Sequence, residues 1–404
     1  MDKDNQLSAV FRIDNVLYCV KGRSSTALVR CDTAELKDYE NYPSITGEFE
    51  KSPSDGKLFN FNLGPASGGI LESVKLNVYT DGERITGIVP ETQFKNRHVR
   101  MKGSAPDDAL LKTERINGAY AAGYGTAFCL AAEDISGVDV DYDVQLVRMI
   151  MSELERMANH IQVIGKLSEG ASQNVATYQL FALEERVRRI ISKHFGHRFF
   201  YGVNGIGGLE RAVATDGLSA ELDRVIGELA SIWDALTSSR MFLDRIQTTC
   251  YAKKPWTVGP VARAADFKFD TRTSGYLPYS DFGFEISSDD TGDVLSRALV
   301  RRYEIDSSRS MIGEICKKVR RVGKKTRTVN GFDGRAVKRV ETPGGDMVMF
   351  LDMKNNLVTG FDIRSASTAN MPAFMQGAVT GILTDFTFAW ESFGFWISEM
   401  GGYQ

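Results

Sequence analysis

Cysteine and histidine are the residue types that would hold a transition metal in this chain, so their spacing is tested first. The five cysteines contain no C-x-x-C pair. Neither a thiolate metal site nor a disulfide framework is therefore predicted, and the cysteines are expected to be small buried apolar residues. They are Cys19, Cys31, Cys129, Cys250 and Cys316.

The four histidines also fail to suggest a metal site, because no two of them show the i, i+4 spacing of a helical zinc site. His194 and His197 are interpreted as a pair at a helix C-terminus that interacts with the last carbonyls. His160 closes a polar series that begins at Glu153 and has helical spacing. Interhelical hydrogen bonding is the preferred interpretation of this series, with a proton relay as the alternative.

Long helices are predicted in the middle of the chain, where apolar residues recur every three to four positions. The clearest covers residues 143–165, with Asp143 as its N-cap and Gly165 at its end. Two more are predicted at 173–194, stopped by Gly196, and at 219–244. Three such segments predict a helical bundle.

The flanking regions are predicted to contain strands. In residues 73–89, Asp81-Gly82 separates two alternating runs and predicts a hairpin. The glycine-rich stretch 202–208 lacks the lysine of a phosphate-binding loop and is interpreted as a tight connection between helices. A further helix is expected over 293–301, continuing past Arg309. The expected fold class is α+β, a central long-helix bundle with β-containing regions at both ends.

Four regions follow from this pattern. Residues 1–60 form an N-terminal extension that is β-rich or irregular, and 61–105 form a β-hairpin region. Residues 106–250 form the helical bundle, and 251–404 form a mixed region that completes the bundle and its pocket.

Composition excludes several classes of protein. The net charge of −3 points to neither nucleic acid nor an anionic membrane surface as a partner. The longest weakly polar stretch, residues 118–132, is shorter than the roughly 20 apolar residues that a membrane span needs. The N-terminus has two acidic residues where a secretory signal would place positive charge. A soluble chain on the cytoplasmic side of the membrane is expected.

A series of blocks in one order resembles the superfamily that unites nickel-iron hydrogenase large subunits with the D-type subunits of NADH:quinone oxidoreductase, and within it the energy-converting, membrane-bound type. The resemblance covers about residues 60–400, and its specificity lies in the order of many weak blocks. They include Gly64-Pro65 with Ile70-Leu71-Glu72, Glu114-Arg115-Ile116, Glu153-Leu154-Glu155-Arg156, Gly259-Pro260-Val261-Ala262-Arg263, Asp270 with Arg272, Val300-Arg301, and Glu341-Thr342-Pro343-Gly344-Gly345.

The resemblance implies where the metal-binding cysteines of hydrogenases would stand. In the family they occupy R-x-C-G-x-C and D-P-C-x-x-C. Here these positions hold Asn117, Tyr120, Trp396 and Glu399. An amide, a phenol, an indole and a carboxylate do not hold a soft metal, so no nickel-iron centre and no other metal is expected on this chain. Gly344 replaces the arginine usual in the late E-x-P-R-G element.

The quinone-reducing D-type subunits also lack these cysteines, but their quinone-site residues do not carry over. The stretch 66–69 lacks the family histidine, and Pro106 stands where a tyrosine is expected. A quinone needs a donor near its carbonyls, and Tyr120 or Tyr124 is a candidate. The alternative is that each is a buried tyrosine with a satisfied hydroxyl.

The resemblance therefore implies a component like the D-type and large subunits in a membrane-associated, ion-translocating redox complex. It would dock to an iron-sulfur small subunit and to membrane-arm subunits, lie peripheral to the membrane, and bind no nucleic acid. Arg115, Arg263, Asp270 and Arg272 are either structural ion pairs or part of a polar pocket wall.

No cofactor is expected on this chain itself. An iron-sulfur cluster is expected in the partner subunit, and a quinone is a candidate electron acceptor. Glu399, the one carboxylate at the four positions, is the candidate proton carrier, with Tyr120 beside it. Two alternatives stay open. One is a quinone-reducing NADH dehydrogenase subunit of the D type with an atypical pocket, and the other is a non-catalytic scaffold.

Overall fold

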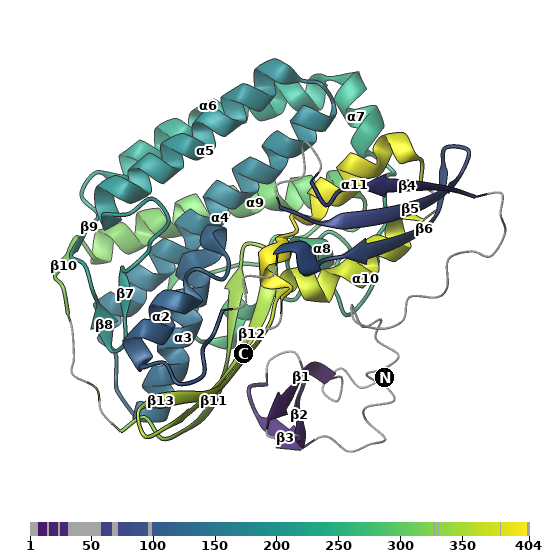
Figure 1. Ribbon diagram of the computed structural model, residues 1–404. Helices are drawn as coiled ribbons and strands as arrows, with labels where there is room; N and C mark the ends of the chain where they lie inside the picture. Colours follow the sequence, from purple (N-terminus) through teal and green to yellow (C-terminus); the bar gives the residue numbers. More distant parts are fainter. Residues whose placement is uncertain are drawn as a thin grey trace.

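The computed structural model describes residues 7–13, 16–22, 25–30, 58–66, 72–95, 99–325, 329, 331–379 and 381–401. Residues 31–57 of the expected N-terminal extension lie outside the described residues, as do 67–71, which include Ile70 and Leu71 of the first family block. The fold is α+β, with long helices packed around a central one and small antiparallel sheets at the periphery (Figure 1).

The helices follow the expected order. Those of eight or more residues are α2 (Pro106–Thr113), α3 (Ala121–Ser136), α4 (Tyr142–Gly170), α5 (Asn174–Phe195), α6 (Leu218–Ser238), α9 (Val294–Lys318), α10 (Ala366–Ala378) and α11 (Phe386–Phe393). Among the described residues, the shorter α-helices are α7 (Arg240–Ile246) and α8 (Gly259–Arg263). Single 3-10 turns include η2 (Gly118–Tyr120), η3 (Thr271–Ser274) and η6 (Ile397–Glu399).

Helix α4 lies at the centre of the molecule, and it is buried on almost every side along its length (Figure 1). Its apolar residues pack against α5, α9, α3 and α11. A helix that is buried all round must satisfy its polar side chains internally, because water does not reach them. This requirement explains why α4 carries hydrogen-bonded charges.

The predicted boundaries of α4 are wrong at both ends. Asp141, not Asp143, is the N-cap, and Asp143 lies in the first turn. Gly165 does not end the helix, which continues to Gly170. A Cβ at Gly165 would lie 2.8 Å from the Phe181 ring of α5, so the glycine permits close helix packing.

Other helix predictions are confirmed or corrected by the backbone. Helix α5 ends at Gly196, which has the left-handed φ of 77°, as predicted. The single helix expected over 219–244 is wrong, because extended backbone at Ser239 divides it into α6 and α7. The stretch 202–208 is a small hairpin of β7 (Asn204–Gly205) and β8 (Gly208–Leu209) between α5 and α6.

The sheets are antiparallel and lie around the bundle. The predicted hairpin at Asp81-Gly82 is confirmed by the pairing of β5 with β6, and the turn places Asp81 opposite Arg84. The strands are β1 (Leu7–Ile13), β2 (Val16–Lys21), β3 (Leu28–Arg30), β4 (Phe59–Leu63), β5 (Lys75–Asp81), β6 (Arg84–Glu91), β9 (Val213–Ala214), β10 (Arg321–Val322), β11 (Gly334–Thr342), β12 (Gly345–Lys354) and β13 (Leu357–Arg364).

The tight turn between β11 and β12 brings the sheet against the bundle. Pro343 and Gly344 form it, and a Cβ at Gly345, the first residue of β12, would meet the Gly259 backbone at 2.5 Å. Close approach to α8 therefore requires glycine at this residue. Among the described residues, no helix is long and apolar enough to cross a membrane.

Candidate functional site

The four residues predicted at the cysteine positions of hydrogenases come together in the folded chain. Asn117 lies before η2, and its side chain Oδ1 accepts a hydrogen bond from the Ala119 N–H. Its Nδ2 donates to Glu399 Oε2 at 3.0 Å, across 282 residues of sequence. The Tyr120 and Trp396 rings meet edge to face, with centroids 6.1 Å apart. The four side chains therefore form one cluster in the interior, here called the Glu399 site.

Glu399 is held by three donors from three segments of the chain. Besides Asn117, the Tyr124 hydroxyl donates to Oε2 at 3.0 Å, and the Ser367 N–H donates to Oε1 at 3.1 Å. The Ser367 hydroxyl accepts from the Trp396 N–H at 3.0 Å. Burial raises the pKa of Glu399, and these hydrogen bonds partly oppose the rise. A buried carboxyl with a raised pKa retains its proton more readily than an exposed one and can serve as a proton carrier.

Ser367 was missed by the sequence interpretation. It lies at the start of α10, 32 residues before Glu399, and its N–H belongs to the first helical turn, where donors have no partner inside the helix. Local sequence carries no indication that this turn would face Glu399. The N-cap of α10, Ser365, marks the helix start in sequence, since its hydroxyl accepts from the Thr368 N–H.

Tyr120 differs from Tyr124 because its hydroxyl is buried without a hydrogen-bond partner among the described residues. A Cβ built on Gly344 would lie 3.3 Å from this hydroxyl, so the turn between β11 and β12 covers it closely. Burial raises the pKa of Tyr120 well above its ordinary value. The phenol is therefore neutral and keeps its proton to donate.

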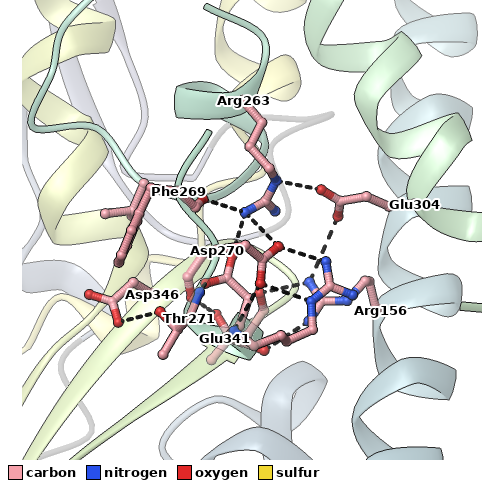
Figure 2. A network of polar contacts seen from close by, with 12 residues as sticks. Arg156, Arg263, Phe269, Asp270, Thr271, Glu304, Glu341 and Asp346 are labelled. Carbon is pink, nitrogen blue, oxygen red and sulfur yellow. Dashed lines mark hydrogen bonds and ion pairs between the residues drawn. The ribbon is translucent and has the colours of Figure 1, made fainter. Parts of the chain in front are cut away.

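A network of buried ion pairs joins Arg156 of α4, Glu304 of α9 and Glu341 near the end of β11 (Figure 2). Arg263 contacts Glu304 at 2.7 Å, Glu341 at 2.8 Å and Asp270 at 3.0 Å. Arg272 contacts Asp270 at 2.7 Å and Glu153 at 3.1 Å. Each of these residues is at most 1% exposed. We call Arg156, Arg263, Arg272, Glu153, Asp270, Glu304 and Glu341 the buried charge network.

Three of the four charged residues singled out in the sequence, Arg263, Asp270 and Arg272, therefore belong to this network. Arg115 does not. It is exposed, donates to the Leu111 carbonyl, and lies over the Tyr201 ring at 5.0 Å. Buried opposite charges in contact are expected to stabilise one another only when all are paired, so the loss of one member should be costly.

The polar series on α4 makes the predicted interhelical hydrogen bonds. His160 Nε2 lies 2.8 Å from Glu304 Oε2 of α9, and the Ser308 hydroxyl of α9 donates to Glu153 at 2.6 Å. Burial lowers the pKa of His160 to about 4, so its ring is neutral at pH 7. The C-terminal histidine interpretation is wrong: His194 Nδ1 contacts the Ala214 carbonyl of β9 at 2.6 Å, and His197 Nδ1 accepts from the Phe199 N–H.

Arg156 links the network to the Glu399 site. Its guanidinium donates to the carbonyls of Glu341 at 2.9 Å and Thr342 at 3.1 Å. These carbonyls end β11, two residues before Gly344, which covers Tyr120. Arg156 thus holds the end of β11 through backbone carbonyls, and the turn that follows β11 covers the Tyr120 hydroxyl.

Glu155, on the same helix, caps the start of α3 next to Tyr120. Its carboxyl oxygens accept from the Ala122 N–H at 2.7 Å and the Gly123 N–H at 3.1 Å. Burial raises the pKa of Glu155 to about 8 despite these two bonds. Between its ordinary pKa of 4.5 and about 8, the folded chain therefore holds a proton that the unfolded chain has released.

This linkage predicts a measurable slope. Stability should fall as pH rises through that window, by about 1.4 kcal/mol per pH unit for one proton. Glu155→Gln has no proton to lose, so its free energy of unfolding should fall less steeply with pH. Urea unfolding of both chains at pH 5, 6, 7 and 8 measures the difference, and parallel curves would contradict it.

The donor set at the Glu399 site does not fit a thiolate-held metal. Its amide, phenol and indole are neutral, and its one carboxylate is a hard ligand. The cysteines Cys19, Cys129 and Cys250 are buried at other places. Within the part of the chain that is described, no group of three or more histidine, cysteine, aspartate or glutamate side chains is arranged to hold a metal ion.

Comparisons with known proteins connect this geometry to a family. Residues 170–331 match the family model of the 49 Kd subunit of respiratory-chain NADH dehydrogenase. The D-type subunit of the NADH-quinone oxidoreductase of Chlorobium phaeobacteroides is 27% identical over 76% of this chain and 79% of its own length. The alpha subunit of the membrane-bound hydrogenase of Pyrococcus furiosus is 24% identical over 72% of this chain and 74% of its own length.

The three-dimensional fold is also similar to that of a solved structure. A protein of the membrane-bound sulfane sulfur reductase (MBS), an archaeal respiratory membrane complex, matches with a TM-score of 0.78 and 20% identity, over 86% of this chain and all of its own length. In sequence this chain is thus similar to the 49 Kd and D-type subunits of NADH dehydrogenases and to the alpha subunit of a membrane-bound hydrogenase, and in fold it is similar to a protein of the MBS complex. The match to a fused C/D-type NADH-quinone oxidoreductase protein of Bdellovibrio bacteriovorus, 25% identical over 66% of this chain, spans half of that protein.

The resemblance based on ordered sequence blocks is thus confirmed, and so is the α+β fold class.

Proposed function

We propose that this chain is a component like the D-type subunits in a membrane-associated, ion-translocating redox complex, without a nickel-iron centre. It docks to an iron-sulfur small subunit and lies peripheral to the membrane through its partners. One observation carries the proposal: the four residues at the former ligand positions converge on a single cluster, and none of them supplies a thiolate.

The names of the relatives support membership in a complex. They are subunits of NADH-quinone oxidoreductases and of a membrane-bound hydrogenase, and the solved structure is that of a respiratory membrane complex. A large subunit with a polar site but no metal of its own needs electrons from a neighbouring redox centre. An iron-sulfur cluster in the small subunit would supply them.

In this proposal the Glu399 site binds the electron acceptor. Glu399 carries the proton, because burial raises its pKa and so favours the protonated form that can donate. Asn117 and Tyr124 orient its carboxyl group, and Tyr120 offers its hydroxyl to an acceptor oxygen. Trp396 excludes water from one side of the cluster.

A quinone-reducing D-type subunit with an atypical pocket is the main alternative. The Tyr120 hydroxyl, which has no partner among the described residues, favours it, since a quinone carbonyl accepts such a hydrogen bond. Neighbouring genes for flavin-binding and NADH-oxidising subunits would support this alternative. A set limited to antiporter-like and iron-sulfur subunits would support the main proposal.

Metal analysis of the purified native complex tests the proposal. We expect iron from the small subunit, co-purifying with this chain, and no stoichiometric nickel. Nickel at about one atom per protein would contradict the proposed lack of a nickel-iron centre. Purification of this protein without any iron-containing partner would contradict the docking.

A further inference from the structure

Arg301 is a buried cation that forms no ion pair with a carboxylate among the described residues, although the charge of Glu304 acts on it from farther away. It lies on α9 and is 1% exposed. Its Nη1 donates to the carbonyl of Arg297 one turn earlier at 3.0 Å, and its Nε has no partner among the described residues. Over the same part of the chain it forms no ion pair with a carboxylate. A buried unpaired charge is destabilising, so its presence needs an explanation that the fold alone does not supply.

Arg297 shows what a satisfied arginine looks like at the same depth on the same helix. Its guanidinium donates to the Ser392 hydroxyl at 2.9 Å and to the carbonyls of Gly292 at 2.9 Å and Cys250 at 3.0 Å. It also lies over the Phe393 ring at 4.6 Å. The chain can therefore surround a buried guanidinium with acceptors, and at Arg301 it has not done so.

The position of Arg301 places its charge at the Glu399 site. Its Nη2 lies 3.2 Å from a Cβ built on Gly394, which begins the loop that carries Trp396 and Glu399. Its charge also acts on the Tyr120 hydroxyl. Burial raises the pKa of Tyr120, the negative charge of Glu399 adds to that rise, and Arg301 opposes it. The Tyr120 phenol thus lies within electrostatic range of both the cation and the carboxyl.

We propose that Arg301 is the counter-charge for an anion at the Glu399 site, and that the acceptor bound there is anionic or becomes anionic when it is reduced. This inference rests on the proposed function for its redox part only. The Nε–H of Arg301 and the hydroxyl of Tyr120 are two donors that no described residue uses, and an anionic oxygen or sulfur atom accepts such bonds strongly.

The charge balance of the reduction follows from these residues. A neutral acceptor takes two electrons, one at a time, from the iron-sulfur cluster of the small subunit, and one proton from the Glu399 carboxyl. The acceptor then carries one negative charge, which Arg301 balances, and the carboxylate left on Glu399 is held by its three hydrogen-bond donors. A second proton from solvent yields the neutral reduced acceptor, which leaves, and another proton from solvent restores Glu399. Stabilising charge that develops in the reaction is the largest single contribution in many active sites.

Two variants of the full chain test whether Arg301 is structural. Arg301→Met removes an unpaired charge and retains the apolar stem, so its melting temperature should equal or exceed that of the wild type. Arg297→Met loses three satisfied hydrogen bonds, so it should melt at least about 2–4 °C lower. If Arg301→Met melts as low as Arg297→Met, the inference is overturned, because Arg301 is then part of the fold.

Bromide binding tests the anion directly and needs neither partner nor electrons. Crystals of the wild-type protein soaked in sodium bromide should show an anomalous peak within hydrogen-bonding distance of the Arg301 guanidinium, absent in Arg301→Met and kept in Arg301→Lys. Absence of the peak in the wild type overturns the inference.

Turnover of the native complex separates this inference from the proposed function. Reduction of decylubiquinone or sodium polysulfide should fall about 100-fold in Arg301→Met and less in Arg301→Lys. Loss of turnover in Glu399→Gln with retention in Arg301→Met would overturn the inference and leave the proposed function intact. Bromide binding with unchanged turnover in both variants would defeat the proposed function and leave the anion site.

Discussion

Glu399→Gln is expected to slow acceptor reduction by the native complex by about 100-fold to 10,000-fold, the range typical of a lost proton carrier. Glutamine has nearly the volume of glutamate and can still accept from Asn117 and Tyr124 through its one oxygen. It cannot release a proton. The loss should therefore appear in the rate of the proton-dependent step, measured as acceptor reduction at saturating acceptor.

A matched control for this variant lies eight residues earlier. Glu391 is also buried, and burial raises the pKa of its carboxyl to about 7, but it belongs to α11 and faces Lys166 rather than the Glu399 site. Glu391→Gln should leave the rate of acceptor reduction within about threefold of wild type, because a buried carboxyl outside the Glu399 site does not pass a proton to the acceptor. Near-normal turnover in Glu399→Gln, in a complex that assembles, would rule out Glu399 as the proton carrier.

Arg263→Met is expected to have the largest effect on stability. The arginine is the common partner of three carboxylates, and its removal leaves Glu304, Asp270 and Glu341 with too little positive charge. Breaking a buried pair on one side typically lowers the free energy of unfolding by about 3–5 kcal/mol. Urea unfolding of the purified protein at pH 8 measures it.

The loss should shrink as pH falls. Burial and the neighbouring charge of Asp270 raise the pKa of Glu341 to about 7, so below that pH Glu341 takes up a proton and one of the unbalanced charges disappears. Arg186→Met is the control, since its pair with Glu228 is about half exposed. Exposed pairs contribute about 0–1 kcal/mol. A change below about 1 kcal/mol in Arg263→Met would show that the network is not mutually dependent.

Helix positions could be predicted from the chain because their causes are local. The apolar spacing of α4 and α5 marks the faces that must be buried, and Gly196 supplies the left-handed residue that ends α5. The errors arose where one residue type serves two purposes. Gly165 looks like a helix end in sequence, and only the neighbouring Phe181 ring shows that its function is close packing.

The candidate site could be predicted in part. Asn117, Tyr120, Trp396 and Glu399 were found through the order of the family blocks, and the structure places them together. Ser367 lies outside the blocks quoted, and Arg301 lies in one of them without any sign there that it would form no ion pair. Their importance depends on which donor faces Glu399 and on which guanidinium lacks a carboxylate, and neither property is written in a local pattern.

The amino-acid sequence alone establishes that Asn117, Tyr120, Trp396 and Glu399 carry no thiolate, because residue type does not depend on folding. It also places the long helices, because periodic burial is a local property. Only the tertiary structure decides that Asn117 and Glu399 share a hydrogen bond across 282 residues, that Arg263 holds three carboxylates, and that Arg301 holds none among the described residues. Those outcomes are long-range, since they follow from how the helices and turns pack around α4 and not from any one segment.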